Sequence, residues 1–467
     1  MERPRTKQVC TIGPASAARV ADMVAAGLDV ARVNFSHGSA DDHRNYVHAV
    51  RAAAHSARRS VAVMVDLPGP KIRIGELAGG QGRLEAGSPF ILRGTEEAPG
   101  DAGGANVPGA DLAGKLQVGD RVLLADGAVE LRVASIDGAD VATEVVNGGV
   151  IRSRSGVGIP SDRLGDTGLT DDDRAAVPRA LELRSDLIAQ SFVRSAEDVQ
   201  ALRALMPADG PRLVAKIETS AALHNFDAIC AAADGIMVAR GDLGVDVPFE
   251  DVPLIQKDLV RRATAAGRFT IVATQMLESM TGAPRPTRAE ASDVANAVLD
   301  GADAVMLSAE TAIGSYPLEA LQAMERICLS AECGPGQALS GTPAANADPS
   351  AATIRAAAEL AEYAGVGAVW CFTRTGRTAE MLSLHRPRVP IMAFTLSPIV
   401  ARRLAVRGGV VPLVLPAAGK SAPLIEQMEQ AWRSQRPSGD VDSVLLLTTS
   451  SQPSGINRLE LHHLAAR

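Results

Sequence analysis

The fold is decided by residues 30–67, which read VARVNFSHGSADDHRNYVHAVRAAAHSARRSVAVMVDL. An apolar, β-type run at 30–35 is followed by a helical pattern at 40–57 and by a second apolar run at 61–67. A strand, a helix and a strand in this order are typical of a parallel β-sheet covered by helices. This unit therefore predicts an α/β fold.

The same alternation continues on both sides of this unit. Helical patterns separate further β-type runs at 7–12, 187–192, 213–218, 235–239, 270–274 and 304–307. Eight strands, each followed by a helix except at one insertion, favour a closed (β/α)8 TIM barrel.

One long stretch interrupts the barrel pattern. Residues 70–163 are Gly-rich and strand-like. Hairpin signals lie between β-type segments there, at Asp126-Gly127, Asp137-Gly138 and Asn147-Gly148. We therefore predict a small inserted β domain at 70–163, which divides the barrel into residues 1–69 and 164–335.

The rest of the chain predicts a separate domain. Residues 333–349 are rich in Gly, Pro and Ala and are typical of a linker. A second series of helices and strands follows, with β-type runs at 366–373, 389–395, 410–415 and 443–449. We expect a three-layer α/β domain at 336–467.

Composition narrows the class of protein. The 467 residues carry a net charge of −7, which argues against nucleic-acid binding and against binding to anionic membranes. There is neither a signal peptide pattern nor an apolar run of the ~18 residues that a membrane helix needs. Five scattered cysteines without a CxxC pair are typical of reduced thiols. We expect a soluble cytoplasmic protein.

Polar residues follow seven of the predicted strands where each strand ends. Arg32, Asn34 and Ser36 alternate along the second strand, so they share one face. The other strand ends carry Asp66, Gln190, Ser191, Lys216, Glu218, Arg240, Asp242, Thr274, Ser308 and Glu310. The C-terminal ends of barrel strands meet at the mouth where TIM-barrel enzymes place their chemistry, so we expect one shared site.

The residue types at these positions indicate a chemistry. Glu218 and Asp242 end neighbouring strands, and two carboxylates with open positions suit Mg²⁺. Lys216 and Arg32 on the same rim would bind an anionic substrate, as phosphoryl transfer requires. A structural ion pair is the alternative explanation for two carboxylates and a lysine. No Walker A loop is present, so a nucleotide would need another kind of site.

These residues closely resemble the pyruvate kinase family. The matching stretches are VCTIGPAS at 9–16, ARVNFSHG at 31–38, DLPGPKIR at 66–73, DGIMVARGDLG at 234–244, ATQMLESM at 273–280, PRPTRAEASDVANAVL at 284–299 and LSAETAIG at 307–314. The resemblance implies transfer of a phosphoryl group from phosphoenolpyruvate to ADP, giving pyruvate and ATP in the last step of glycolysis. It also implies Mg²⁺ (Mn²⁺ being an alternative), a mobile β-barrel lid at the insertion, and a cytosolic homotetramer.

The resemblance also implies a role for each site residue. Lys216 and Arg32 would hold the phosphoryl group, and Ser191 would help to order the substrate. The substrate carboxylate would lie on the backbone of Ala239, Arg240 and Gly241. Mg²⁺ would be bound by Glu218 and Asp242. Nucleotide contacts would come from Asn34, His37 and Arg73. A proton would reach the enolate through water from Thr274, with Ser308 and Glu310 nearby.

The sequence departs from the family pattern around the monovalent cation. Asn34, Ser36, Asp66 and the carbonyl of Leu67 resemble the family's potassium cage. Potassium-requiring members have a glutamate where this chain has Lys71, so the chain resembles the potassium-independent branch. A lysine ammonium could replace the ion's charge, and we expect that K⁺ is not required. The alternative is that Lys71 is a surface lysine and K⁺ still binds.

Two further positions leave their roles open. The family often has a nucleotide-binding lysine on the lid where this chain has Ser155, beside Arg154, which could substitute for it. The turn TRTGRT, which begins at Thr373 and ends at Thr378, has the composition of a phosphate-binding turn, and similar turns bind sugar-phosphate effectors in the family. An ordinary capped turn explains it equally well.

Two other functions compete with the kinase. A lyase of the phosphoenolpyruvate/pyruvate barrel group would use Mg²⁺ on similar carboxylates, but it would need neither Arg73 nor a lid. A catalytically silent paralogue that binds sugar phosphates would not need Lys216, Glu218, Asp242 and Thr274 together. Formation of pyruvate that depends on ADP would separate the three.

Overall fold

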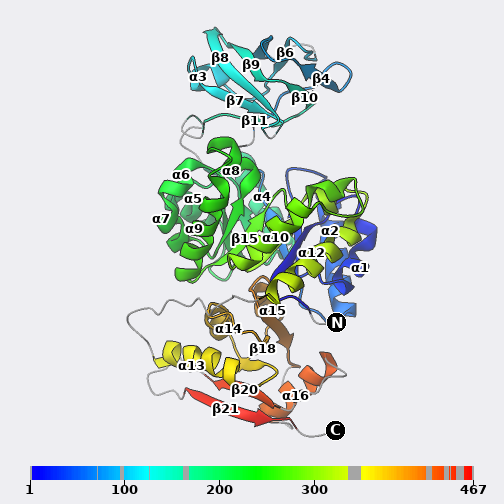
Figure 1. Ribbon diagram of the computed structural model, residues 1–467, viewed down its shortest axis with the longest axis vertical. Helices are drawn as coiled ribbons and strands as arrows, with labels where there is room; N and C mark the ends of the chain where they lie inside the picture. The colour runs from blue at the N-terminus through cyan, green and yellow to red at the C-terminus, as the bar shows by residue number, and fades with distance from the viewer. Residues whose placement is uncertain are drawn as a thin grey trace.

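The computed structural model divides into three stacked domains (Figure 1). The inserted β domain lies at one end, the barrel in the middle and the C-terminal domain at the other end. The structure describes residues 3–70, 72–94, 99–125, 127–160, 163, 168–334, 349–416, 423–435, 441, 443–448 and 457–464.

The central domain is a closed barrel of eight parallel strands, which confirms the predicted TIM barrel. In order around the barrel the strands are β1 (Lys7–Thr11), β2 (Val30–Asn34), β3 (Ala62–Asp66), β12 (Leu187–Gln190), β13 (Arg212–Ile217), β14 (Gly235–Ala239), β15 (Phe269–Ala273) and β16 (Ala304–Leu307). β1 pairs with both β2 and β16, so the sheet has no edge.

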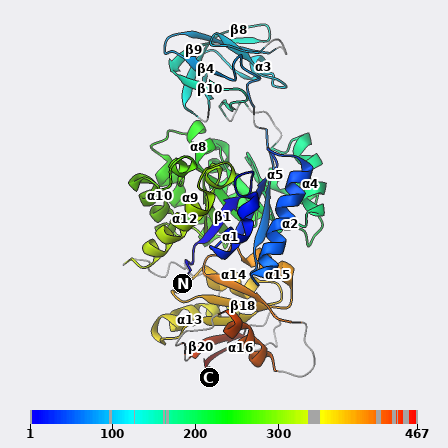
Figure 2. The same ribbon diagram turned by 90° about the vertical axis from the view of Figure 1, so that its right-hand side faces the viewer.

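Helices surround the barrel and cover its outer face (Figure 2). They include α1 (Val20–Ala25), α2 (Ala40–Ser56), α4 (Asp171–Glu182), α5 (Ala196–Arg203), α7 (Phe226–Ala232), α9 (Val252–Ala265), α10 (Arg288–Leu299) and α12 (Pro317–Glu332). Short turns of helix follow three strands: α6 (Ser220–His224), α8 (Arg240–Asp246) and α11 (Ala309–Ala312). Capping boxes begin α4 at Thr170 and α10 at Thr287.

The inserted domain has its own hydrophobic core, which includes Phe90, Leu124 and Leu131. A six-stranded sheet contains β5 (Pro89–Arg93), β6 (Gly104–Asn106), β7 (Arg121–Leu124), β8 (Val129–Asp137), β9 (Asp140–Asn147) and β11 (Val157–Gly158). A two-stranded sheet contains β4 (Gln81–Leu84) and β10 (Gly149–Arg152), and one short helix is α3 (Leu112–Lys115). We call this domain the lid.

Two of the three predicted hairpins are confirmed and one is wrong. β7 and β8 form an antiparallel pair, as do β8 and β9. After Asn147-Gly148, however, β10 pairs with β4 and not with β9. A Cβ at Gly148 would clash with the carbonyl oxygen of Leu84. This glycine therefore permits close approach of two strands, which a hairpin signal cannot distinguish from a tight turn.

The C-terminal domain is a three-layer α/β unit, as predicted. Its sheet runs in the order β19 (Val410–Val414), β18 (Ile391–Thr395), β17 (Val369–Phe372), β20 (Ser443–Thr448) and β21 (Arg458–His463). Separate apolar clusters lie on its two faces. Its helices are α13 (Pro349–Tyr363), α14 (Arg377–Ser383), α15 (Pro398–Leu404) and α16 (Leu424–Gln435). No helix in the described ranges is both long and apolar enough to cross a membrane.

The C-terminal domain closes the base of the barrel. Ala405 and Val406, which follow α15, pack into the apolar cluster that fills the barrel interior. Ion pairs cross the same junction, including Arg402 Nε to Asp186 Oδ1 at 2.8 Å and Arg212 to Glu380 at 3.3 Å. The base of the barrel is therefore covered, and the open mouth lies at the other end, facing the lid (Figure 1).

Candidate active site

A row of buried charges lies at the mouth of the barrel. Arg32 on β2 contacts Asp66, the last residue of β3, through Nε at 2.7 Å and through a second guanidinium nitrogen at 2.6 Å. The second carboxylate oxygen of Asp66, Oδ1, lies 3.4 Å from Nζ of Lys216 on β13. Asp66 is 1% exposed and lies between the two cations. Arg32 comes from the neighbouring strand β2, whereas Lys216 comes from β13, which is separated from β3 by β12.

Lys216 is held by three oxygen-bearing side chains. Its Nζ lies 2.9 Å from Oε1 of Glu218 and donates a hydrogen bond to Oγ of Ser191 at 2.8 Å. Burial alone would lower the pKa of Lys216, but the Asp66 and Glu218 carboxylates outweigh it and raise that pKa above its ordinary value. Lys216 is therefore cationic at neutral pH.

The same charges act on Asp66 in the opposite direction. Burial alone would raise the pKa of Asp66, but Lys216 and Arg32 outweigh it and hold that pKa below its ordinary value. Asp66 is thus a fixed anion between two fixed cations, and it sets where both of them point.

Glu218 and Asp242 place two carboxylates close enough to affect one another's charge. Oε2 of Glu218 accepts a hydrogen bond from the backbone N–H of Phe192 at 2.6 Å, whereas buried Oε1 accepts no hydrogen bond of ordinary geometry. Burial and the nearby charge of Asp242 raise the pKa of Glu218, against the opposing effect of Lys216. Two carboxylates that repel one another fit a divalent cation.

The lid closes over this pair. Glu218 and Asp242 line a cavity of about 40 Å³ together with Pro70, Gly156 and Ile159 from the lid and its connections. A lid side chain also reaches the barrel, because Arg121 donates a hydrogen bond to the carbonyl of Val245 at 3.2 Å. Across the described ranges, no three His, Cys, Asp or Glu side chains are grouped as metal ligands. A cation here would complete its shell with substrate oxygens and water.

Hydrogen bonds connect Thr274, which follows β15, to the start of α8. Oγ1 of Thr274 accepts a hydrogen bond from the N–H of Gly241 at 2.7 Å and donates one to the carbonyl of Ala273 at 2.6 Å. Thr274 has a φ of 69° and Gln275 a φ of 54°, a region that residues with a side chain rarely adopt. Their carbonyls accept hydrogen bonds from the Arg240 guanidinium, which holds this strained turn in place.

Glu310 supports the adjoining backbone. It is 1% exposed, and its two carboxylate oxygens accept hydrogen bonds from the N–H groups of Leu277 at 3.1 Å and Ser308 at 2.7 Å. This geometry makes Glu310 a positioning residue for the Thr274 and Ser308 segments. Both carboxylate oxygens are already occupied by these backbone groups.

The residues predicted to contact a nucleotide lie at the end of β2 and in the loop that follows it, and at the start of the lid. Arg73 donates a hydrogen bond to the carbonyl of Arg154 at 3.1 Å, and both line a cavity of about 820 Å³ at the start of the lid. Arg154 is ion-paired with Glu76 at 2.8 Å. On β2 and its loop, Oδ1 of Asn34 accepts from the N–H of Ser36, and the carbonyl of His37 contacts the His43 imidazole.

The predicted cation cage is only partly described. The carbonyl of Leu67 accepts a hydrogen bond from Ser191 at 2.8 Å, and Asp66 faces Arg32 and Lys216 as above. Lys71 lies outside the described residues.

The predicted phosphate-binding turn lies in the C-terminal domain. Oγ1 of Thr373 accepts a hydrogen bond from the N–H of Gly376, whose φ of 96° makes the turn into α14.

Sequence reasoning missed Thr11. Its Oγ1 accepts a hydrogen bond from Arg32 at 2.8 Å and donates one to the carbonyl of Leu307 at 3.0 Å. Thr11 is the last residue of β1, so the rule that polar strand ends build the site, applied to the first strand as well, would have found it.

Comparisons with known proteins agree with this architecture. The family model described as pyruvate kinase, barrel domain, matches residues 3–321, and the one described as pyruvate kinase, alpha/beta domain, matches residues 351–461. The chain is 41% identical to a pyruvate kinase from Geobacillus stearothermophilus over 87% of this chain and 71% of the relative. It is 41% identical to one from Mycobacterium tuberculosis over 91% of each.

A solved structure shows the same fold over nearly the whole chain. The crystal structure of a pyruvate kinase from Cryptosporidium parvum superposes with a TM-score of 0.86 at 33% identity, and covers 99% of this chain and 96% of the other. A family match that spans the barrel and the C-terminal domain, with relatives of this identity and coverage, leaves one assignment. The chain belongs to the pyruvate kinase family, whose members are kinases.

Proposed function

We propose that this chain transfers the phosphoryl group of phosphoenolpyruvate to ADP at the Arg32–Asp66–Lys216 row, with Mg²⁺ on Glu218 and Asp242. The observation that carries the proposal is the position of Lys216, buried at the mouth and within 3.4 Å of two carboxylates from different strands. Phosphoryl transfer depends mainly on positioning and on neutralisation of charge, which this row supplies.

Arg32 and Lys216 would bind the migrating group from two sides. Asp66 orients both cations, and Thr11 fixes the end of the Arg32 side chain. Since these partners hold the cations before substrate arrives, little reorganisation is needed when charge develops in the transition state. Ser191, already bonded to Lys216, would help to order the substrate.

Glu218 and Asp242 would hold the magnesium ion. The ion would give Oε1 of Glu218 a partner besides Lys216, and the repulsion between the two carboxylates would be relieved. The ion, when bound, neutralises phosphate charge and polarises substrate oxygens. The substrate carboxylate would lie near Ala239, Arg240 and Gly241, where the Gly241 N–H must first leave Thr274.

Proton delivery would involve Thr274 through water. Arg240 and Glu310 hold the backbone on either side of this residue and of Ser308, so the hydroxyl groups stay at the rim.

The nucleotide would lie toward Asn34, His37 and Arg73, with Arg154 as the lid contact. We also infer that the protein works in the cytosol as a homotetramer in glycolysis, and that a sugar phosphate at Thr373 to Thr378 is a candidate effector.

The deciding experiment is release of pyruvate from phosphoenolpyruvate, measured by coupled reduction to lactate. Turnover should require both ADP and Mg²⁺, and Lys216→Met should abolish it while Lys257→Met, a change at a surface ion pair, should not. Pyruvate release without ADP would favour the lyase. Absence of turnover with every nucleoside diphosphate would favour the silent paralogue and overturn the proposal.

A further inference from the structure

A cavity of about 470 Å³ lies on the flank of the barrel, between the helices α2 and α4. Figure 2 shows both helices on the outside of the barrel. Arg32, Asp66 and Lys216, which form the row of buried charges at the mouth, do not line this cavity. Its volume is within the range of small-molecule sites. We call it the flank cavity.

Basic side chains from both helices line the flank cavity. Arg44 and Arg51 are two turns apart on α2, so they lie on the same side of that helix. Arg179 on the last turn of α4 and Arg184 just after it line the cavity from the other side. With one more from α15, five arginines of the described chain face a single carboxylate in the lining, that of Glu182.

Three of the five arginines have carboxylate partners outside the lining. Arg51 and Arg402 share one carboxylate, because each contacts Asp186 at 2.8 Å. Arg44 is paired with Asp41, one turn earlier on the same helix, and both side chains are exposed. An exposed pair of this kind is well solvated and holds its arginine only weakly, so Arg44 can turn to another anion.

The two arginines on the α4 side have no such partner. Within the described ranges, the side chains of Arg179 and Arg184 form neither a hydrogen bond nor an ion pair. The Arg179 guanidinium lies over the ring of Phe35, with its central carbon 5.1 Å from the ring centroid. Since this cation–π contact holds the guanidinium in place, less side-chain freedom is lost when a ligand binds it.

The wall of the flank cavity contains one further polar group. His43 is 3% exposed and is stacked on Phe35, with the ring centroids 4.5 Å apart. Its Nε2 contacts the carbonyl oxygen of His37 at 2.7 Å, whereas its buried Nδ1 has no hydrogen-bond partner in the described part of the chain. Buried polar atoms are usually hydrogen-bonded, so this exception is expected where a water molecule or a ligand completes the wall.

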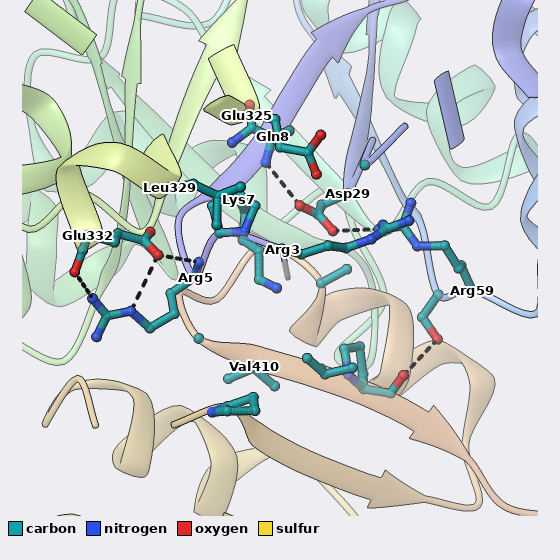
Figure 3. Close-up of a pocket in the computed structure, with 18 of the residues that line it drawn as sticks. Arg3, Arg5, Lys7, Gln8, Asp29, Arg59, Glu325, Leu329, Glu332 and Val410 are labelled. Atoms are coloured by element: carbon teal, nitrogen blue, oxygen red, sulfur yellow. Dashed lines mark hydrogen bonds and ion pairs between the residues drawn. The ribbon is translucent and has the colours of Figure 1, made fainter. Parts of the chain in front are cut away.

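A larger cavity at the base of the barrel, of about 730 Å³, provides a comparison, and we call it the base cavity. Arginines line it too, but Figure 3 shows two of them in ion pairs, Arg59 with Asp29 at 2.9 Å and Arg5 with Glu332 at 3.4 Å. In the flank cavity, by contrast, the described lining contains one carboxylate, and two of its arginines are unpaired. Its positive charge is therefore complementary to an anion.

We propose that the flank cavity binds a small molecule that carries a phosphate group, held by the guanidinium groups of Arg179 and Arg184, with Arg44 on the facing helix. A planar guanidinium can donate two parallel hydrogen bonds to a phosphate group, which a lysine ammonium cannot. A phosphate dianion would offset the two unpaired charges. Val47 and Leu183 also line the cavity and offer an apolar surface to the carbon atoms of such a molecule.

The proposal can be tested on the intact protein through the reactivity of its arginines. Modification with phenylglyoxal, followed by peptide mass spectrometry, measures how accessible each guanidinium group is. Glycerol 3-phosphate is the phosphate probe, succinate is a dicarboxylate of similar size, and sodium chloride at equal ionic strength is the control. Arg174 is the internal reference, because it is exposed on the same helix, α4, and does not line the cavity.

Glycerol 3-phosphate should protect Arg179 and Arg184 in a saturable way and leave Arg174 unchanged. Arg179→Gln removes one charge, so the concentration of glycerol 3-phosphate that half-protects Arg184 should rise by roughly 10–100-fold, as expected for lost hydrogen bonds between charged groups. Arg174→Gln, the matched control on the same helix, should leave that concentration at the wild-type value.

Three results would overturn the proposal. The first is a reactivity of Arg179 and Arg184 that glycerol 3-phosphate does not change beyond the sodium chloride control. The second is an unchanged half-protecting concentration in Arg179→Gln, which would place the phosphate elsewhere. The third is equal protection by succinate, which would mean that the cavity attracts dianions by charge alone and does not recognise phosphate.

Discussion

Two buried lysines at opposite ends of the same barrel have opposite electrostatic surroundings. Lys216 at the mouth lies within 3.4 Å of Asp66 and Glu218, and these carboxylates raise its pKa. Lys7 at the base has its nearest acids engaged by Arg59 and Arg5, and burial lowers its pKa. Burial is similar, at 9% and 6% exposed, so the partners make the difference.

The mouth of the barrel therefore holds a lysine together with its counter-charges, whereas the base holds a lysine without one. At the mouth, cations and carboxylates are interleaved before any substrate arrives. At the base, the nearest carboxylates are paired with arginines. The same substitution, lysine to methionine, should therefore have opposite effects at the two ends, because methionine keeps most of the volume and removes the charge.

The largest expected effect is that of Lys216→Met. Loss of a preorganised charge at the reacting group should lower kcat by about 10³-fold or more. Removal of one partner from a buried ion pair typically costs about 3–5 kcal/mol, so thermal stability should fall too. Steady-state kinetics and calorimetry measure the two effects. A variant with unchanged kcat would remove Lys216 from the mechanism.

The next effect is that of Glu218→Gln, which keeps the shape and removes one negative charge. We expect kcat to fall by about 10²–10³-fold and the Mg²⁺ concentration needed for half-maximal rate to rise. Asp242→Asn should behave alike. The control is Glu310→Gln, because the Glu310 carboxylate accepts hydrogen bonds from two backbone N–H groups and is not assigned to the ion, so its Mg²⁺ dependence should remain that of the wild type. If Glu218→Gln, Asp242→Asn and Glu310→Gln all showed the same Mg²⁺ dependence, Glu218 and Asp242 would not be the ligands of the ion.

Much of this arrangement could be predicted from local pattern. The βαβ alternation predicts the barrel because each strand and each helix is marked by its own apolar period. The strand-end rule brings Arg32, Lys216 and Glu218 together because the parallel strands of a barrel all end at one rim. The structure then adds what the pattern could not supply, which is that Asp66 lies between Arg32 and Lys216.

Features that depend on pairing between distant segments could not be predicted. β10 pairs with β4 across more than sixty residues, and no local signal encodes this partner. β21 was not expected, since its residues are exposed or half-buried, mixed in polarity and placed antiparallel at a sheet edge. The base cavity joins the first residues of the chain to β19, and only the fold brings them together.

A third prediction concerns the monovalent cation. Activity should be the same in Na⁺ and K⁺ buffers of equal ionic strength, because Lys71 would supply the charge that K⁺ gives to other members of the family. Lys71→Glu should then create activation by K⁺ of several-fold, measured as initial rate against K⁺ concentration. Strong activation of the wild type by K⁺ would show that the ion still binds and that Lys71 does not replace it.

The smallest effect, and the one that tests the comparison most directly, is that of Lys7→Met on stability. The pKa of Lys7 is lower in the folded than in the unfolded protein, where it is about 10.4. Below the folded pKa the unpaired charge destabilises the fold fully, and this cost disappears as pH rises through the folded pKa toward the unfolded value. Lys7→Met should therefore raise Tm by a few degrees at neutral pH, and the gain should vanish near pH ~10.4.

The contribution of Lys216 to stability should not change with pH below ~10.4, which serves as the control. The folded pKa of Lys216 is raised, so its contribution to stability is complete at neutral pH and is lost only as pH rises through that folded value. Differential scanning calorimetry of both variants across this range compares the two ends of the barrel in one experiment. A Lys7→Met protein that is less stable than wild type at neutral pH would mean that Lys7 has a counter-charge after all, and that the two ends of the barrel are built alike.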